Sequence, residues 1–561
     1  MERSRPTGGR ERLAARTVAL SRAVDPITFE VLRHRLWTIN DEAAAVLRVV
    51  SGSPVATETH DYNTMLMDAQ GHAFVAGTYM MSQAIGQDLM VQHILRECAE
   101  SPGFGEDDVF LCSNPYVGAA HQNDVTCLAP IYWKGELVAW SGVTIHEIDV
   151  GGPVPGSQCC IGAKSIYEEA PVIPPLKLVE GGRLRKDIEE EYLNRSRTRD
   201  LNAMDLRAKL AALHTVKQRL HGLVDRYGVE TVRAVMTGMI EYAEARLRAR
   251  LRELPDGTWR HTAYVDYYDA GELGIYPIRL TMTKQGDRLI FDFRGSAKQA
   301  PAVVNCSYAG LLAGIMGAVI PYLCYDMPWS PAGVLRVIEV RSEPGTICHA
   351  AWPAGVCKAT TAATPMVNTA ACVCVAKMLS ASEDHRQLLM APWMSLAAVQ
   401  EVFGVDQRGE PFGVTMLDPM AGGGGARTDR DGIDTGGIIR ALSLSIANVE
   451  TYEFRYPFLY LARRQEPDSG GAGRFRGGMG VGIVYTPHPV AAIPTVILHT
   501  LCNAVPGSVG LAGGYPACTN QFFVLRDSDL WERFARGELP GRLDELQGHL
   551  EVTEAIQATS L

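Results

Sequence analysis

The sequence predicts an α+β fold of several subdomains, rich in β-structure and with several helices. At 561 residues the chain is too long for one compact core, so two to four domains or subdomains are expected. Three long segments carry apolar residues at helical spacing. Between and after them, short apolar runs alternate with turns rich in Gly, Pro and Asn, which is typical of strands.

The predicted helices cover residues 27–50, 203–224 and 229–252. In the first, apolar residues follow the helical repeat from Val31 to Val50. In the second and third, leucine, valine and methionine form one apolar stripe. The third also carries a run of arginines, which we interpret as a solvated helix face.

The structure of the remaining segments is predicted from their local pattern of apolar, polar and turn-forming residues. Residues 51–175 have the pattern of strands, and "IRLTMTKQGDRLIFDF" that of a hairpin turning at Gln285–Asp287. Residues 305–385 are expected to form packed helices with strands between them, and the glycine-heavy chain from Gly422 a β-rich region. The expected division is a loose or disordered extension (1–24), an α/β region with the candidate metal site (25–200), a helical pair and hairpin (201–300), a mixed α/β region (301–420), a glycine-rich β region (421–525) and a tail (526–561).

The composition excludes several functional classes. Hydrophobic residues make up 47% and charged residues 21%, with a formal net charge of −10, so no nucleic-acid partner is expected. No run of about eighteen apolar residues predicts a membrane span, and the arginine-rich start lacks the apolar core of a secretion signal. Thirteen cysteines lie in apolar contexts without a Cys-x-x-Cys pair, which favours a reduced, cytoplasmic protein without a thiolate zinc site.

The glycine runs and cysteines do not predict a nucleotide or nucleophile site. "MAGGGGARTDRDG" and "DSGGAGRFRGGMG" lack the Gly-Lys-Ser/Thr ending of a phosphate loop. We interpret them as turns and tight strand crossings. No Gly-x-Ser-x-Gly elbow is present, and the cysteines of "GYPAC" and "GVCKAT" have no local base.

Polar side chains interrupt two segments that otherwise have the pattern of buried strands. His121, Asn123 and Asp124 lie within "VGAAHQNDVTC", and His146 lies within "TIHEIDVGG". Burying such groups is costly unless a partner satisfies them. A mutual hydrogen-bond network is one such partner, since His and Asp usually make ordinary hydrogen bonds. The other is a divalent Zn, Mn or Fe ion held by His121, Asp124 and His146, with positions open for water and substrate.

A set of ordered motifs extends from about Asp25 to about Tyr515. The motifs are "DPITFEVLRHRL", "NPYVGAAHQNDVTCLAPIYWKGELVAW", "HEIDVGGPVPGS", "EEAPVIPPLKL", "LPDGTW", "FDFRGSAKQA" and "PDSGGAGRFRGGMG". Through them the sequence resembles the hydantoinase B/oxoprolinase family. The resemblance implies a hydantoinase B-like fold.

The resemblance also implies partners and chemistry. Members of the family work with a separate actin-like, hydantoinase A-like subunit, which binds ATP and Mg and phosphorylates a carbonyl oxygen of a small-molecule substrate. The subunit that this chain resembles then completes the reaction. Hydantoinases, oxoprolinases and lactamases add water, whereas acetone and acetophenone carboxylases add CO₂ derived from bicarbonate. A cytoplasmic, hetero-oligomeric enzyme without nucleic-acid or membrane partners is therefore expected.

Site residues follow from the same resemblance. The metal ligands of family members, a His, an Asp three residues later and a more distant His, match His121, Asp124 and His146. This favours a metal over a hydrogen-bond network. Asp61 matches a recurrent acidic position and, with Asn123, is a candidate catalytic residue. For Asp61 a hydrogen bond at the entry of a strand is the alternative.

Two departures bear on the substrate. The region "AGVCKATTAATPMVNT" differs from the Gly-Asn-containing motif of many hydantoinase-type relatives, which disfavours a cyclic amide. The chain also ends at "EVTEAIQATSL", where many relatives continue into a glycine-rich tail that a small third subunit could supply. Ketone carboxylation with bicarbonate is thus the first expectation. Hydrolysis of a hydantoin, 5-oxoproline or another lactam is the alternative, and a non-catalytic scaffold subunit is the third.

Overall fold

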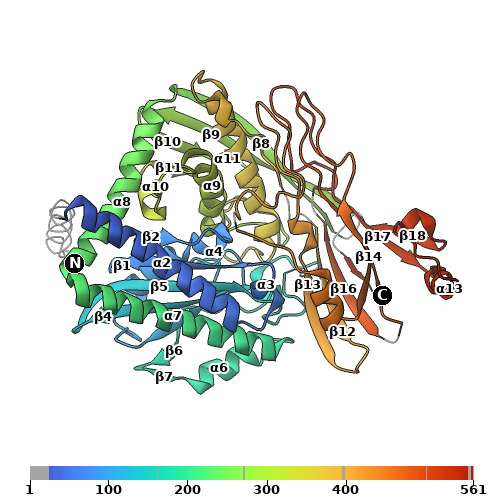
Figure 1. Ribbon diagram of the computed structural model, residues 1–561, viewed down its shortest axis with the longest axis horizontal. Helices are drawn as coiled ribbons and strands as arrows, with labels where there is room; N and C mark the ends of the chain where they lie inside the picture. Colours follow the sequence, from blue (N-terminus) through green and yellow to red (C-terminus); the bar gives the residue numbers. More distant parts are fainter. Residues whose placement is uncertain are drawn as a thin grey trace.

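The part of the chain that the structure describes folds into an α+β arrangement of five sheets with helices between and around them (Figure 1). The computed structural model describes residues 24–553 and 557–559, except residues 159, 161, 270–271, 395–397, 442, 490 and 501. The predicted extension over residues 1–24 lies outside the described residues apart from Val24. The predicted fold class is confirmed, whereas the six-segment division of the chain stays a prediction.

The largest sheet has seven strands, and its neighbours are all antiparallel. Their order is β2 (Ala73–Ala76), β1 (Tyr62–Asp68), β5 (Glu136–His146), β4 (Asp124–Trp133), β3 (Val109–Cys112), β6 (Leu176–Glu180) and β7 (Arg183–Leu184). The strand pattern predicted for residues 51–175 is confirmed for β1 to β5, whereas Pro54–Thr57, Met81–Ala84, Gln87–His93 and Ile94–Cys98 within this range are helical. β4 and β5 are buried along most of their length, because both faces of the sheet are covered.

Three long helices pack together beside this sheet, with α2 (Pro26–Val50) and α7 (Arg199–Tyr227) lying across one face (Figure 1). α8 (Val229–Arg252) packs against both of them. All three were predicted, but α7 begins earlier than its apolar stripe. Its first turn is polar and is held by tertiary contacts: the Asn202 amide donates to the Asp149 carbonyl at 2.9 Å. The spacing of apolar residues cannot predict a helical turn that is held by polar contacts with another segment.

The opposite face of the sheet is covered by two short helices, α4 (Met81–Ala84) and α5 (Gln87–His93). The other short helices are α3 (Pro54–Thr57), α6 (Lys186–Leu193), α10 (Pro331–Leu335), α12 (Val449–Arg455) and α13 (Leu530–Ala535). α4 places Gln83 beside Asp61, which precedes β1, and Asp124, the first residue of β4, and the Gln83 amide donates to both carboxylates.

A second core forms around α9 (Tyr308–Leu323) and α11 (Ala363–Ser380). α11 packs on a four-stranded sheet whose order is β11 (Ile338–Arg341), β10 (Arg288–Asp292), β9 (Glu272–Gln285) and β8 (Gly257–Asp269). The predicted hairpin joins β9 to β10, with Gly286 at a φ of +60°. The packed helices expected over residues 305–385 are confirmed.

One helical stretch of the described chain meets the length and composition of a membrane span. It covers Ala359–Ser380, and 94% of its apolar window is buried inside the protein. A helix that packs in a core passes the same test, because burial against protein also selects apolar residues on every side.

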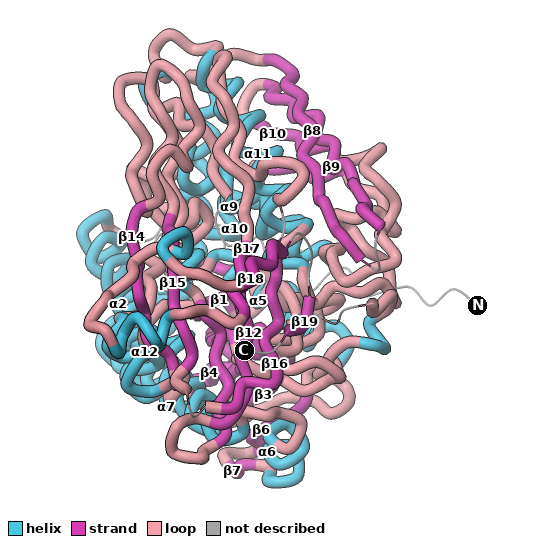
Figure 2. The backbone as a smooth tube through the Cα atoms, turned by 90° about the vertical axis from the view of Figure 1, so that its right-hand side faces the viewer, coloured by secondary structure: helices cyan, strands magenta, loops and turns pink. Residues whose placement is uncertain are grey.

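The C-terminal part is rich in β-structure, as predicted, and its strands are joined by long loops. One sheet has the order β13 (Pro411–Met416), β12 (Ala398–Val405), β16 (Ala492–Thr500) and β19 (Gln557–Thr559). Two strand pairs join β14 (Phe458–Gln465) to β15 (Val481–Pro487), and β17 (Phe522–Arg526) to β18 (His549–Thr553). Figure 2 shows loops extending beyond the ends of β14 and β15. Glycine-rich loops of this part of the chain line a cavity of about 1460 Å³.

The first glycine run serves close backbone packing. A Cβ on Gly425 would lie 1.7 Å from the Ala391 carbonyl oxygen, and one on Gly423 would lie 1.9 Å from that of Gly478. Both distances are impossible for a side chain, so only glycine fits. This agrees with our interpretation of the run as a tight crossing of backbone segments.

The described cysteines are all free thiols, and among them only Cys518 is exposed. Burial raises the pKa of the thiols in the core, for example that of Cys112 to about 12. These cysteines therefore pack as small apolar residues.

Candidate metal centre

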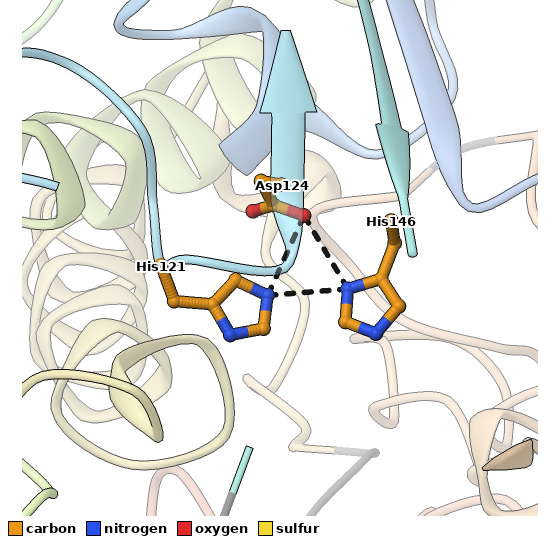
Figure 3. A group of neighbouring side chains, drawn as sticks. All are labelled: His121, Asp124 and His146. Carbon is orange, nitrogen blue, oxygen red and sulfur yellow. Dashed lines mark hydrogen bonds and ion pairs between the residues drawn. The ribbon is translucent and has the colours of Figure 1, made fainter. Parts of the chain in front are cut away.

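Three buried side chains converge where the strands β4 and β5 meet (Figure 3). Asp124 is the first residue of β4, and the antiparallel register places it opposite His146, the last residue of β5. His121 precedes β4 in a tight turn, in which the Asp124 amide donates to the His121 carbonyl at 3.2 Å. The turn and the register together bring to one point residues that are 25 positions apart.

The ring nitrogens of the two histidines face each other and the same carboxylate oxygen. His121 Nε2 lies 3.1 Å from His146 Nδ1. Each of these nitrogens lies 3.4 Å from Asp124 Oδ1. One possible metal-ligand atom from each of the three residues lies within 4.8 Å of the other two. His121 and Asp124 are each only 1% exposed. The structure thus brings together the three residues proposed from the sequence.

The proton on His121 is placed by a backbone carbonyl. His121 Nδ1 lies 2.9 Å from the carbonyl oxygen of Cys357, which precedes α11. Because a carbonyl oxygen can only accept, Nδ1 carries the proton of the neutral ring. Nε2 of the neutral ring therefore presents a lone pair to His146 Nδ1. Such a hydrogen bond on the far nitrogen is the usual way to orient a metal-binding histidine.

Gln158 controls the proton on His146. The Gln158 amide nitrogen lies 2.8 Å from His146 Nε2 and donates to Glu401 Oε1 at 2.9 Å. In this orientation the ring proton of His146 lies on Nδ1 and points at His121. A half-turn of the amide would present its oxygen to Nε2, which would then carry the ring proton and donate it to that oxygen, and Nδ1 would be left with a free lone pair. Burial raises the pKa of Glu401 well above its usual range, so its protonated carboxyl can donate to that oxygen.

The carboxylate of Asp124 is ionised and only partly hydrogen-bonded. Burial acts against its charge, yet the imidazoles of His121 and His146 hold the pKa of Asp124 well below its usual range. Burial likewise disfavours a charged His121, but Asp124 outweighs it and raises the pKa of that imidazole. The second oxygen, Oδ2, is buried without a hydrogen-bond partner. Two imidazoles and a carboxylate with a free oxygen fit a divalent cation of the Zn, Mn or Fe type, so this buried set could bind a metal.

Asp61 and Asn123, the candidate catalytic residues, lie beside these three. Gln83 donates to Asp61 Oδ1 at 2.6 Å and to Asp124 Oδ1 at 3.1 Å, so one amide ties the two carboxylates together. Burial raises the pKa of Asp61. The Asn123 amide donates to the carbonyls of Glu147 and Gly156, which fixes the turn before β4. Catalytic roles for both residues stay predictions.

Sequence reasoning missed several residues of this site. Gln83, Gln158 and Arg440 line the small cavity between the strand ends and β12, together with Asp61 and the three proposed ligands. Each comes from a separate segment without a motif of its own. Arg440 carried the clearest signal, as a charged residue in the otherwise apolar and small-residue run "GGIIRALSL".

Glu169 positions the carbonyl that orients His121. Its carboxylate accepts from the backbone amides of Val356 and Cys357 at 2.7 and 2.9 Å and from the Gln122 amide at 2.6 Å. Burial raises its pKa to about 7. Glu169 therefore joins the segment that holds Cys357 to the turn that holds His121.

Sequence comparisons relate this chain to several known proteins. A sequence model described as hydantoinase B/oxoprolinase matches residues 25–558. Caprolactamase subunit beta of Pseudomonas jessenii is 32% identical, over 83% of this chain and 78% of that protein. The acetone carboxylase alpha subunit of Xanthobacter autotrophicus is 24% identical, over 95% of this chain and 71% of that protein.

Two solved structures have the same fold. Nucleotide-free acetone carboxylase superimposes with a TM-score of 0.87 at 21% identity, covering 98% of this chain and 76% of that one. The ATP-dependent caprolactamase of Pseudomonas jessenii gives 0.76 at 26% identity, covering 96% and 90%. These similarities confirm the mixed α+β, multi-sheet fold.

Proposed function

This chain belongs to the hydantoinase B/oxoprolinase family, and on that basis we propose that it is the metal-binding catalytic subunit of an ATP-dependent multi-subunit enzyme. A partner subunit phosphorylates a carbonyl substrate, and this chain completes the reaction. The relatives named above are themselves designated as subunits. The observation that carries the proposal is the buried set of His121, Asp124 and His146.

Each residue of the site has a defined task. His121 and His146 offer ring nitrogens whose protons are placed by Cys357 and Gln158, and Asp124 offers an ionised carboxylate. A divalent Zn, Mn or Fe ion held there would polarise a carbonyl or phosphoryl oxygen or lower the pKa of a water molecule. The protein around it excludes bulk solvent, because the lining side chains are buried.

ATP and Mg belong to the partner in this scheme. The partner is a hydantoinase A-like subunit, in a cytoplasmic hetero-oligomer that could include a small third subunit. The glycine run at Gly423 and Gly425 supports this division of labour, because its glycines are required for backbone packing rather than for a phosphate cradle.

Two reactions fit the site, and sequence similarity ranks them. Caprolactamase subunit beta, at 32% identity, is more similar to this chain than the acetone carboxylase alpha subunit, at 24%. Hydrolysis of a cyclic amide is therefore the first candidate. Carboxylation of a ketone with bicarbonate, which the sequence analysis favoured, is the second, supported by the acetone and acetophenone carboxylase relatives.

A product assay distinguishes the two reactions. The complex with its ATP-binding partner is incubated with ATP and either a lactam or hydantoin, or a ketone with labelled bicarbonate. We expect ATP-dependent release of a ring-opened amino acid. Label incorporated into a carboxylic acid product would assign carboxylation instead. ATP-independent turnover, or none with any of these substrates, would contradict the proposed function.

Metal content tests the ligands directly. The full-length chain should contain about one divalent metal, because three protein ligands with an open position form a stable site. His121→Ala and Asp124→Ala should each lose most of it while keeping the wild-type circular dichroism spectrum. Elemental analysis after removal of loosely bound ions is the measurement.

The matched control for this measurement is His72→Ala. His72 pairs with Asp68 at 3.0 Å, outside the small cavity and without a second histidine, so its loss should leave the metal content unchanged. Equal metal in the wild type and both ligand variants would refute the assignment. Full activity of a metal-free complex would favour the scaffold subunit considered from the sequence.

A further inference from the structure

Arg440 is a buried arginine whose side chain lines the small cavity beside His121, Asp124 and His146. It is 1% exposed. One guanidinium nitrogen, Nη2, donates to the Thr360 carbonyl at 2.7 Å, whereas Nε is buried without a hydrogen-bond partner. Arg440 forms no ion pair within the described part of the chain, and Asp61 acts on it only from beyond ion-pair distance.

Such an arginine is unfavourable in the folded chain alone. Removing a guanidinium from water without a close counter-ion is costly, and leaving an N–H group unpaired adds to the cost. Burial lowers the pKa of Arg440 to about 10, so the group is still charged at neutral pH. A charged donor in this position therefore lacks an acceptor of opposite charge.

The charges around the cavity also indicate that the site lacks a negative charge. The titratable and charged groups that line it are Asp61, Asp124, Arg440 and the two imidazoles. A divalent cation on the three ligands would add two positive charges. Even with both carboxylates ionised, the site would carry one positive charge in excess, and an anion beside Arg440 would neutralise it.

We infer, on the basis of the function proposed above, that Arg440 anchors a small oxyanion next to His121, Asp124 and His146. The oxyanion is bicarbonate or the phosphoryl group of the activated substrate. A planar guanidinium binds either one through parallel N–H···O hydrogen bonds. The unpartnered Nε is available for such a bond, and Thr360 fixes the plane of the guanidinium through Nη2.

Binding of the two anions is measured on the complex of the full-length chain with its ATP-binding partner, loaded with Mn²⁺. Inorganic phosphate and bicarbonate are titrated separately by calorimetry, and metal content is determined in parallel. We expect the wild type to bind at least one of them. Arg440→Met should weaken that binding by about 10- to 100-fold, the loss expected for a hydrogen bond to a charged group, with the metal retained.

The control is Arg250→Met, which removes an arginine paired with Asp326 at 2.9 Å outside this cavity and should not change either affinity. A loss for bicarbonate alone assigns bicarbonate, and a loss for phosphate alone assigns the phosphoryl group. If Arg440→Met does not fold, Arg440→Lys replaces it. Lysine keeps the charge without the planar fork, so weaker anion binding with the metal retained is again expected.

Two results would overturn the inference. The first is an unchanged affinity for both anions in the arginine variant that folds. The second is a metal-loaded wild type that binds neither anion. In both cases a wild-type protein that contains the metal would still agree with the proposed function. A wild-type protein without metal would instead contradict the proposed function itself.

Discussion

Replacing His146 with alanine should separate ATP cleavage from product formation. We expect product formation to fall by at least about a thousandfold, because metal catalysis contributes several kcal/mol and each 1.4 kcal/mol corresponds to about tenfold. Substrate-dependent ATP cleavage should stay within about tenfold of the wild type, because the candidate ligands lie in this chain and the nucleotide is assigned to its partner. Phosphate release and product are measured in the same assay on the complete complex.

His72→Ala is the reference for this experiment as well, and it should keep ATP use and product formation coupled. Equal proportional loss of both activities in His146→Ala would argue against separate sites for the two steps. Unimpaired product formation would exclude an essential role for His146. The phosphorylated substrate should otherwise decay unproductively, so more ATP should be consumed per product formed.

The largest effect on stability is expected for Lys209→Met. Lys209 on α7 and Glu147, which directly follows His146, form an ion pair in which the side chains are 0% and 1% exposed. Where Glu147 is ionised, breaking such a buried pair by removing one partner costs about 3–5 kcal/mol of the free energy of unfolding, because the other charge stays uncompensated. Urea denaturation of the full-length chain measures this cost.

The cost should increase with pH. Burial raises the pKa of Glu147 to about 8, and the ammonium group of Lys209 limits that rise. Without Lys209 the pKa of Glu147 in the folded protein should rise further. A carboxyl whose pKa is higher in the folded state than in the unfolded state loses stability as pH rises through that range. The difference between variant and wild type should therefore be larger at about pH 9 than at about pH 6.

An exposed ion pair on the same helix provides the comparison. Arg219, 60% exposed, pairs with Glu42 of α2 at 2.5 Å, and Arg219→Met should lower the free energy of unfolding far less than Lys209→Met does. The double variant Lys209→Met/Glu147→Gln should recover part of the loss, because no charge is left buried. A cost for Lys209→Met as small as that for Arg219→Met would contradict the importance of the buried pair.

The parts of this fold that the sequence predicted are those that leave a local pattern. The apolar repeats of α2 and α8 gave their bounds to within a residue, and the turn at Gly286 identified its hairpin. The polar first turn of α7 was not predicted, because it is stabilised by Asp149 from another segment. Strand order could not be predicted, since pairing depends on contacts between distant segments.

The same distinction applies to the site. His121 and Asp124 are three residues apart, and they were identified because they are polar residues in a segment with the pattern of a buried strand. His146 stood out in the same way, but only the register of β4 and β5 places it opposite Asp124, and the family resemblance favoured a metal over a hydrogen-bond network. Gln158 and Arg440 reach the cavity from segments without local motifs, so only the folded chain places them beside the proposed ligands.

The order in which a ribosome makes these segments has a consequence for metal binding. The residues that line the cavity extend from Asp61 to Arg440 along the chain. At about 5–20 residues per second, synthesis of the intervening stretch takes roughly 20–80 s. During that time the β4–β5 pair can already place Asp124 beside His146, but Cys357 and Glu401 have not yet emerged to fix the imidazoles. A metal ion that met the chain at that stage would lack the hydrogen bonds that orient the two imidazoles, so we expect the proposed ligand set to be complete only once Glu401 has been synthesised.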